Sequence, residues 1–443
     1  MKNSIQTLKI IIAIFVMALT TNLFAQRDKI DNFRSYDKDG LNVFETPKDL
    51  NTTFDGIRLR IGGAFSQQFQ ALDHENTAFS DTTGVVNSLY DLSPGFNLAT
   101  ANLNIDVQLA DGITLNMITY LSSRHHSEAW VKGGYMQFDK LPFIKNEAVT
   151  SLMEKVTIKV GHMEVNYGDA HFRRTDNGNA IYNPFVGNYL IDVFNTEIGA
   201  EVYYRNNGMI GMLGVTGGEI NGNVKDLDPN GIGETETDDK LARSPSIIGK
   251  LGYDSQINDD LRFRLTGAAY YTASSNTNHI LDGDRGGSRY YLAMSAPGAR
   301  AGDDFRTGRY NPGFRDEVTL LSGNVFLKYQ GFELFSFVES GKGKSNNEVD
   351  TRNFTHFAAD VVYRFGKTEN VFFGGRYNTV KADDVSGQEI TINRIQVGAG
   401  WFVTKNILAK LEYVNQEYKD FGATSRLADG KFNGIMVEAV VGF

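Results

Sequence analysis

The feature that most constrains this sequence is a two-residue alternation of apolar and polar side chains, which recurs along almost the whole chain. It is clearest at residues 99–109, where Leu103 and Ile105 alternate with Asn104 and Asp106. Successive side chains of a strand point to opposite faces, so each such segment has one apolar and one polar face. The apolar face must lie against a protein core or against lipid.

The alternating segments predict an all-β fold, an antiparallel transmembrane β-barrel. We predict 16 strands, at residues 57–69, 96–110, 112–123, 129–139, 155–167, 194–205, 208–217, 246–256, 260–272, 317–329, 332–340, 353–365, 369–380, 390–404, 406–419 and 431–443. The even count suits a bacterial barrel, with short periplasmic turns on one side and long extracellular loops on the other. Residues 289–294 (RYYLAM) could supply two more half-strands, so 18 strands is the alternative.

Two connections depart from this pattern. Residues 124–128 are short for an outer loop, and residues 140–154 are long for a turn on the short side. The sequence NEAVTSLME within the second connection suggests a short helix there.

The N-terminus reads as an export signal. Lys2 and Lys9 provide its positive start, Ile10–Leu19 is an uncharged apolar run, and Ala25 marks the cleavage site. About ten apolar residues are too few to cross roughly 30 Å of hydrocarbon as a helix. We therefore predict a signal peptide at residues 1–25, a periplasmic N-terminal segment at 26–53 and the barrel at 54–443.

No later apolar run is long enough for a membrane-spanning helix. An exported chain that stays in a membrane must satisfy all its backbone polar groups within lipid. Without spanning helices, a closed barrel is the structure that does so.

Composition excludes several functional classes. The chain contains 0 Cys, which removes disulfides, thiolate catalysis and Cys-ligated zinc. A net charge of −9 argues against a nucleic-acid partner. None of the 7 His lies in a nucleophile-elbow or metalloprotease motif, so we predict no enzyme activity and no cofactor other than calcium.

The chain ends in GIMVEAVVGF, an alternating strand that terminates on Phe443. This ending resembles the insertion signal of Gram-negative outer-membrane proteins. From about Phe54 onward the chain resembles porins of the Bacteroidota type, and its signal ends in Ala25-Gln26 as in exported proteins of that phylum. The resemblance implies the cell outer membrane, with lipid, lipopolysaccharide and the barrel-assembly machinery, through Phe443, as partners. It also implies that loop 168–193 folds inward and constricts a pore.

Charged side chains on the polar faces and in loop 168–193 are the candidate pore-lining residues. They are Arg58, Arg60, Asp106, Arg173, Arg174, Glu197, Glu201, Arg262, Arg264, Arg376 and Arg394. Such charges could select ions through their field. The alternatives are cross-strand ion pairs inside a water-filled barrel and, for the loop, a solvated surface position.

Loop 218–245 contains Asp226, Asp228, Asn230 and Glu234 in an order that begins like a calcium-binding loop. Thr237 stands where that loop has its bidentate Glu. The sequence therefore leaves open a calcium site and an acidic loop that only attracts divalent ions.

Two functions fit these observations. The first is a passive diffusion channel for small hydrophilic solutes or ions, since 16 strands leave an aqueous lumen unless loops fill it. The second is a binding barrel, or an accessory subunit of an uptake or secretion complex, whose mark would be a lumen plugged by residues 27–53. Strand 332–340 has apolar side chains on both faces, which hints at a contact in a homo-oligomer.

Overall fold

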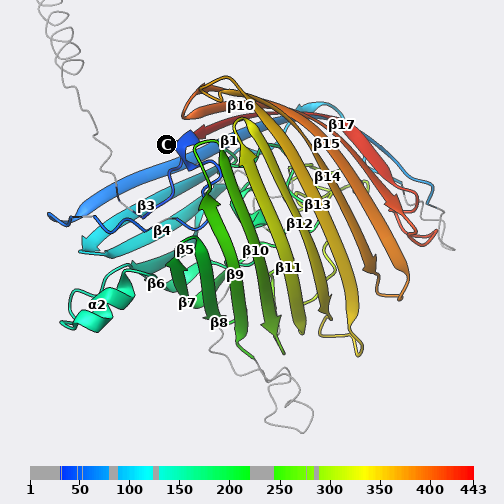
Figure 1. Cartoon of the computed structure of the whole chain (residues 1–443). Coiled ribbons are helices and arrows are strands. Elements are labelled where there is room, and N and C mark those ends of the chain that lie inside the picture. Colours follow the sequence, from blue (N-terminus) through cyan, green and yellow to red (C-terminus); the bar gives the residue numbers. More distant parts are fainter. Residues whose placement is uncertain are drawn as a thin grey trace, which may run out of the picture.

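The computed structural model describes residues 30, 32–46, 48–51, 53–78, 88–122, 129–219, 244–275, 277–283 and 289–443. These residues form a closed antiparallel barrel of sixteen long strands and one two-residue strand, β2 (Figure 1). The strands are β1 (Arg58–Glu75), β2 (Gly95–Phe96), β3 (Thr100–Ala110), β4 (Ile113–Ser122), β5 (Ala129–Phe138), β6 (Val156–Glu164), β7 (Thr196–Asn206), β8 (Met209–Thr216), β9 (Ser246–Gln256), β10 (Leu261–Thr272), β11 (Val318–Tyr329), β12 (Phe332–Gly343), β13 (Arg352–Phe365), β14 (Val371–Asp383), β15 (Glu389–Thr404), β16 (Ile407–Lys419) and β17 (Lys431–Gly442).

The prediction of 16 membrane strands is confirmed, and the alternative of 18 is wrong. Residues 289–294 form a loop, in which Arg289, Leu292 and Met294 have positive φ angles of 81°, 62° and 60°. Residues other than glycine rarely adopt this left-handed backbone conformation, and strands have negative φ. The segment RYYLAM is therefore an irregular loop and not a pair of strands.

The barrel closes between its first and last strands. β1 pairs with β17 from Ala64↔Gly442 to Glu75↔Lys431, and on its other side β1 pairs with β3. The backbones of Gly63 and Phe443 exchange two hydrogen bonds, of 2.8 and 2.9 Å. No strand edge is left open in this ring, as a membrane barrel requires.

Short connections follow the expected turn chemistry. In the β7–β8 turn, Asn207 and Gly208 have φ angles of 50° and 83°. An Asn-Gly pair tolerates positive φ at both central positions, which a two-residue hairpin needs to match the twist of its strands. The long connections lie at the opposite ends of the strands, except the β5–β6 connection, which lies on the side of the short turns.

The two faces of each strand differ as the alternation predicts. In β3, Leu103 is exposed on the outer surface, while Asn104 and Asp106 are buried inside the barrel. The outer surface carries many exposed apolar side chains, including Leu251 and Leu321. Apolar groups on the outside and polar groups on the inside are the arrangement of a barrel embedded in lipid.

The described residues contain little helical structure. α2 (Glu147–Met153) lies in the β5–β6 connection, projects away from the barrel (Figure 1), and begins at Asn146, whose side chain accepts a hydrogen bond from the Val149 amide. This confirms the short helix predicted at NEAVTSLME. Two single 3-10 turns, η1 (Lys38–Gly40) and η2 (Ala170–Phe172), lie elsewhere in the chain. Within the described ranges, no helix is both long and apolar enough to cross a membrane.

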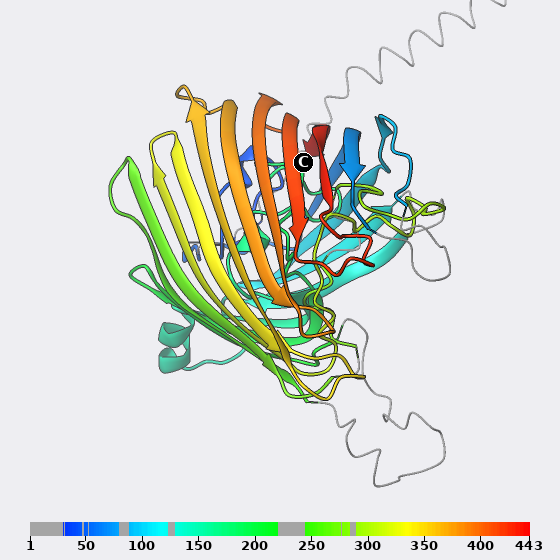
Figure 2. The same ribbon diagram turned by 90° about the vertical axis from the view of Figure 1, so that its right-hand side faces the viewer.

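The barrel encloses other parts of its own chain (Figure 2). We call residues 32–51 the plug segment and residues 165–195, which connect β6 to β7, the inner loop. Phe335 and Phe337 of β12 point inward, and the ring centroid of Tyr189 in the inner loop lies 5.1 Å from that of Phe337. The apolar inner face of this strand therefore packs on the inner loop, so it gives no evidence for an oligomer contact.

Candidate functional site in the barrel lumen

The inner loop is held in the lumen by charged side chains of the barrel wall. A buried loop would leave backbone polar groups without partners, and the wall supplies them. Glu412 of β16 accepts a hydrogen bond from the Val186 amide at 2.7 Å. Lys410 of the same strand donates at 3.0, 3.1 and 2.9 Å to the carbonyl oxygens of Ala180, Asn183 and Phe185. The expectation that loop 168–193 folds inward is confirmed.

A glycine of the wall makes room for this loop. A β-carbon at Gly398 of β15 would lie 3.1 Å from Cδ1 of Phe185, closer than most such contacts in proteins. Glycine on the inner face thus leaves space, but the Phe185 ring fills that space.

Part of the plug segment also lies within the lumen. The Asn42 amide donates to Glu333 of β12 at 2.6 Å, and the Tyr36 hydroxyl donates to Asp106 of β3 at 3.0 Å. Phe44 is buried, with its ring centroid 5.3 Å from that of Phe326. These residues of the plug segment lie among inward-facing acceptors and rings of the wall, and the periplasmic position predicted for residues 26–53 stays a prediction.

A cluster of charges joins the plug segment, the inner loop and the wall. Arg264 of β10 lies 2.7 Å from a Glu45 oxygen and 2.8 Å from Asp169 of the inner loop. Lys250 of β9 contacts the same two carboxylates at 3.1 and 3.2 Å. Burial alone would raise the pKa of both carboxyls, but the two cations overcome it and hold each pKa below its usual range.

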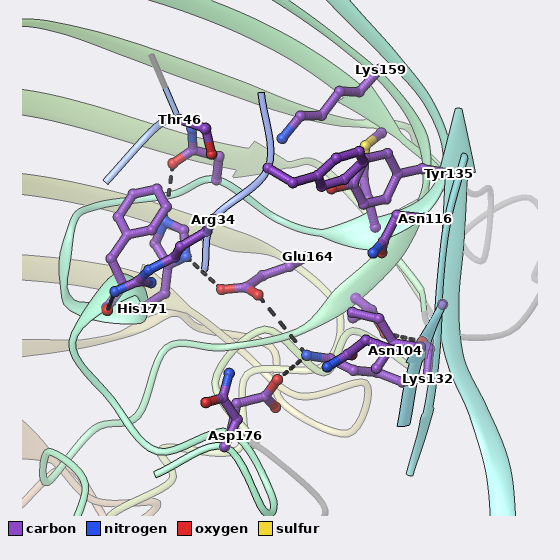
Figure 3. Close-up of a pocket in the computed structure, with 18 of the residues that line it drawn as sticks. Arg34, Thr46, Asn104, Asn116, Lys132, Tyr135, Lys159, Glu164, His171 and Asp176 are labelled. Carbon is purple, nitrogen blue, oxygen red and sulfur yellow. Dashed lines mark hydrogen bonds and ion pairs between the residues drawn. The ribbon is translucent and has the colours of Figure 1, made fainter. Parts of the chain in front are cut away.

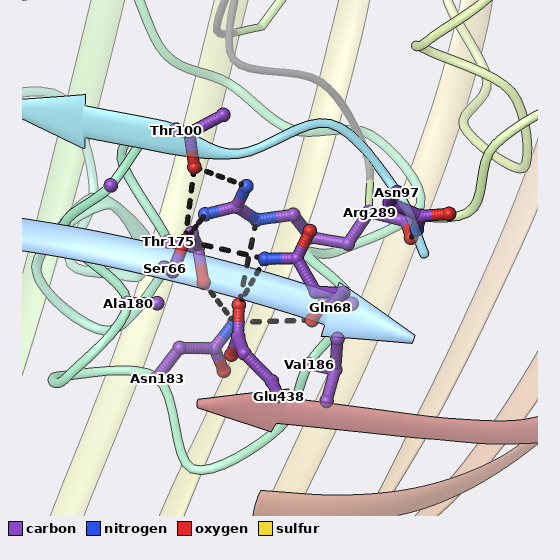
Figure 4. Close-up of polar contacts among 12 residues, drawn as sticks. Ser66, Gln68, Asn97, Thr100, Thr175, Ala180, Asn183, Val186, Arg289 and Glu438 are labelled. Atoms are coloured by element: carbon purple, nitrogen blue, oxygen red, sulfur yellow. Dashed lines mark hydrogen bonds and ion pairs between the residues drawn. The ribbon is translucent and has the colours of Figure 1, made fainter. Parts of the chain in front are cut away.

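A third segment, the β10–β11 connection, reaches into the lumen near β1 (Figure 4). The Arg289 guanidinium donates to the hydroxyls of Ser66 and Thr100, each at 3.1 Å. Beside it, the Gln68 amide donates to Glu438 of β17 at 2.6 Å. Three segments of the chain therefore narrow the lumen.

A cavity of about 200 Å³ lies between the plug segment, the inner loop and the wall (Figure 3). Strands β3 to β7 provide one side of it, and the plug segment and the inner loop provide the other. Its charged lining residues are Arg34, Glu45, Lys132, Lys159, Glu164, His171, Arg174 and Asp176.

Most of these charges are paired across the cavity wall. Nδ1 of His171 lies 2.5 Å from Glu164, and its Nε2 lies 3.0 Å from the Asn166 side-chain oxygen. Lys132 donates to Asp176 and lies 4.0 Å from Glu164. The side chain of Glu164 keeps 33% exposure, so the cavity retains an accessible, charged surface.

The pore-lining candidates from the sequence lie on the inner face of the barrel or in the inner loop, and most form ion pairs. The pairs, with their nitrogen–oxygen distances, are Arg58–Asp55 (2.8 Å), Arg60–Asp106 (2.6 Å), Arg173–Glu333 (3.5 Å), Arg174–Asp192 (2.5 Å), Arg262–Asp254 (2.7 Å), Arg264–Asp169 (2.8 Å) and Arg376–Asp360 (2.6 Å). Arg60–Asp106, Arg262–Asp254 and Arg376–Asp360 join neighbouring strands, as in the cross-strand alternative, and the other four pairs involve loop residues. A role in ion selectivity stays a prediction.

The remaining candidates have neutral partners. Arg394 donates to the Gln416 side chain and to the Asn188 carbonyl, both at 2.6 Å. Glu197 accepts a hydrogen bond from the Tyr270 hydroxyl at 2.9 Å, and Glu201 accepts one from the backbone amide of Asn166 at 3.2 Å. Of all the candidates, only Arg174 lines the cavity.

The sequence analysis did not predict the other charged residues that line the cavity, above all Lys132 and Lys159. Each alternates with outward apolar residues of its strand, so the two-residue period could have placed both inside. The inner loop partners of Lys132 lie far away in sequence and carry no such signal.

The proposed calcium residues Asp226, Asp228, Asn230 and Glu234 lie outside the described residues, as does the predicted signal peptide. Among the residues that are described, no group of three or more His, Asp or Glu side chains could hold a metal ion.

No family model and no curated protein matches this chain. Solved structures do resemble it. An anion-selective porin from Comamonas acidovorans is 11% identical, with 88% of this chain and 100% of that chain covered and a TM-score of 0.51. The outer-membrane channel DcaP of Acinetobacter baumannii is 10% identical, with coverage of 88% and 99% and a TM-score of 0.48. The likeness to the first structure shows a shared barrel fold.

Proposed function

We propose that this chain is an outer-membrane channel for the passive diffusion of small hydrophilic solutes. The observation that carries the proposal is a closed barrel with an apolar exterior and a polar interior, which still holds a charged cavity of about 200 Å³. A polar lumen surrounded by a lipid-facing wall is the form of a diffusion pore.

The plug segment and the inner loop set the size of the solute. The cavity exceeds the roughly 10–15 Å³ that one water molecule needs, and it is smaller than the roughly 300 Å³ of a pocket for drug-sized ligands. A solute of monosaccharide size or smaller suits this space. The dense packing of the inner loop against Lys410 and Glu412 excludes larger molecules from the opposite wall.

Liposome swelling with a graded set of neutral sugars tests the proposal. Proteoliposomes should swell quickly in a pentose, more slowly in a hexose and barely in a trisaccharide. Protein-free liposomes provide the control. If the proteoliposomes swell in the pentose no faster than protein-free liposomes, the proposal is wrong.

The plug segment favours a second candidate, a binding barrel or an accessory subunit of an uptake or secretion complex. The segment contacts Asp106, Glu333 and Arg264 inside the lumen, and a plugged lumen is the mark expected of this class. A stable partner that copurifies from native membranes, together with no swelling in any sugar, would support this candidate over a channel.

Further assignments are proposals as well. We place the chain with porins of the Bacteroidota type, on the ground of its loop style and the Ala25-Gln26 signal ending. Phe443 is exposed at the end of β17, where the barrel-assembly machinery could read it. We also propose that the chain contacts lipopolysaccharide at its outer rim, forms a homo-oligomer and binds calcium at loop 218–245.

A further inference from the structure

Lys159 of β6 differs from the other cations that line the cavity. Its ammonium group has no hydrogen-bond or ion-pair partner among the residues that the structure describes. It lies 5.2 Å from the ring centroid of Tyr135 and 5.0 Å from that of Tyr203 (Figure 3). These ring contacts favour a cation but leave all three N–H donors free.

The neighbouring carboxylates are all engaged elsewhere. Glu201 is the cross-strand partner of Lys159, yet its oxygens accept from the Tyr203 hydroxyl and the Asn166 amide. Glu45 is held by Arg264 and Lys250, as described above. Lys159 is therefore a positive charge that no acid of the cavity neutralises by contact.

Two neutral groups of the lining also lack partners among the described residues. They are the Asn116 side-chain oxygen and Nε2 of His162, both buried. The Asn116 oxygen can only accept a hydrogen bond, and a buried polar atom without one is costly. Hydroxyl groups of a solute could supply the missing donors.

We propose that the cavity binds a small hydroxylated organic anion, of the chemistry of a sugar acid, with the carboxylate at Lys159. The carboxylate accepts from the ammonium, the hydroxyls bond the Asn116 oxygen and His162, and the Tyr135 ring contacts the apolar face of the solute. This inference deepens the proposed function and rests on it, because the solute reaches the cavity along the proposed passage.

Calorimetry of the detergent-solubilised mature chain with three sugars of one size tests the charge preference. Glucuronate, glucose and glucosamine present a negative, a neutral and a positive group on the same ring. We expect glucuronate to bind most tightly and glucosamine least. Equal affinities for glucuronate and glucose, or no glucuronate binding, would overturn the inference.

The variant Lys159→Gln tests the assigned residue. Loss of a charged hydrogen bond should weaken glucuronate binding about tenfold and leave glucose binding unchanged. Lys367→Gln, in the exposed β13–β14 turn, removes the same charge outside the cavity and should have no effect. An unchanged glucuronate affinity in a folded Lys159→Gln protein contradicts the assignment. If that variant does not fold, the ranking of the three sugars on the native chain still decides.

Failure of this inference differs from failure of the proposed function. Calorimetry requires no transport, so glucuronate binding without liposome swelling would defeat the channel and keep the site. Swelling without selective glucuronate binding would keep the channel and defeat the site.

Discussion

Inward-facing arginines dominate the residue scale of this barrel. Arg264, Arg376 and Arg394 are among the largest fully buried side chains. In place of hydrogen bonds to water, each guanidinium donates to carboxylates, side-chain amides or loop carbonyls. An isolated buried charge would be too costly, so these pairs fix the position of the segments that they contact.

The Arg376–Asp360 pair should be essential for stability. Among the described residues, Arg376→Ala leaves the buried Asp360 with the Tyr189 hydroxyl, at 3.0 Å, as its one side-chain partner. This loss should lower the free energy of unfolding by about 3–5 kcal/mol. Lys381→Ala, on the same strand but in an exposed pair with Glu389, should change it by less than about 1 kcal/mol. Urea unfolding followed by tryptophan fluorescence measures both, and equal effects would contradict this account.

Gly398 should tolerate no larger side chain. Gly398→Val places its β-carbon against Phe185 and should destabilise the folded barrel by about 1–3 kcal/mol through overpacking. Gly249→Val is the matched change on the outer face, where a β-carbon meets nothing within 4 Å, and should destabilise the barrel less. The same unfolding assay compares the two, and a stable Gly398→Val protein would show that Phe185 does not seat there.

At the scale of elements, the strands were predictable, and the lumen contents were predictable only in part. The two-residue period placed all sixteen strands near their observed bounds, because lipid outside and water inside impose opposite polarity on alternate residues. The inward fold of the inner loop followed from the resemblance to porins. The sequence suggested residues 27–53 as a plug only for a binding barrel, and it could not predict the contacts of the plug segment. These contacts, such as Asn42 with Glu333, join residues 291 positions apart and depend on shape.

The docking of the plug segment should depend on Glu45, whose side chain is only 4% exposed. Glu45→Gln leaves Arg264 and Lys250 short of one carboxylate, so the segment should exchange its backbone hydrogens at least tenfold faster. Hydrogen exchange measured by mass spectrometry reports this. Asp49→Asn, an exposed change in the same segment, is the control. Equal protection in both variants would show that the charge cluster does not hold the segment.

The pH dependence of that docking follows from the lowered pKa of Glu45. Burial opposes ionisation of Glu45, but Lys250 and Arg264 outweigh it. The ionised carboxylate therefore stabilises docking at every pH above its usual range, and the stabilisation is lost only as the pH falls through the lower pKa. Exchange protection, corrected for intrinsic rates, should be equal at pH 7 and pH 5. A loss of protection between these values would contradict the assignment.

At the scale of the whole molecule, the central claim is that a lipid-facing barrel keeps a narrow polar passage beside its own plug segment. Single-channel recording in planar bilayers tests this most directly, on the native chain and on Glu45→Gln. We predict small, uniform conductance steps for the native chain and larger or more frequent steps for the variant. The absence of steps from both proteins, each shown to be a folded barrel, would contradict the account.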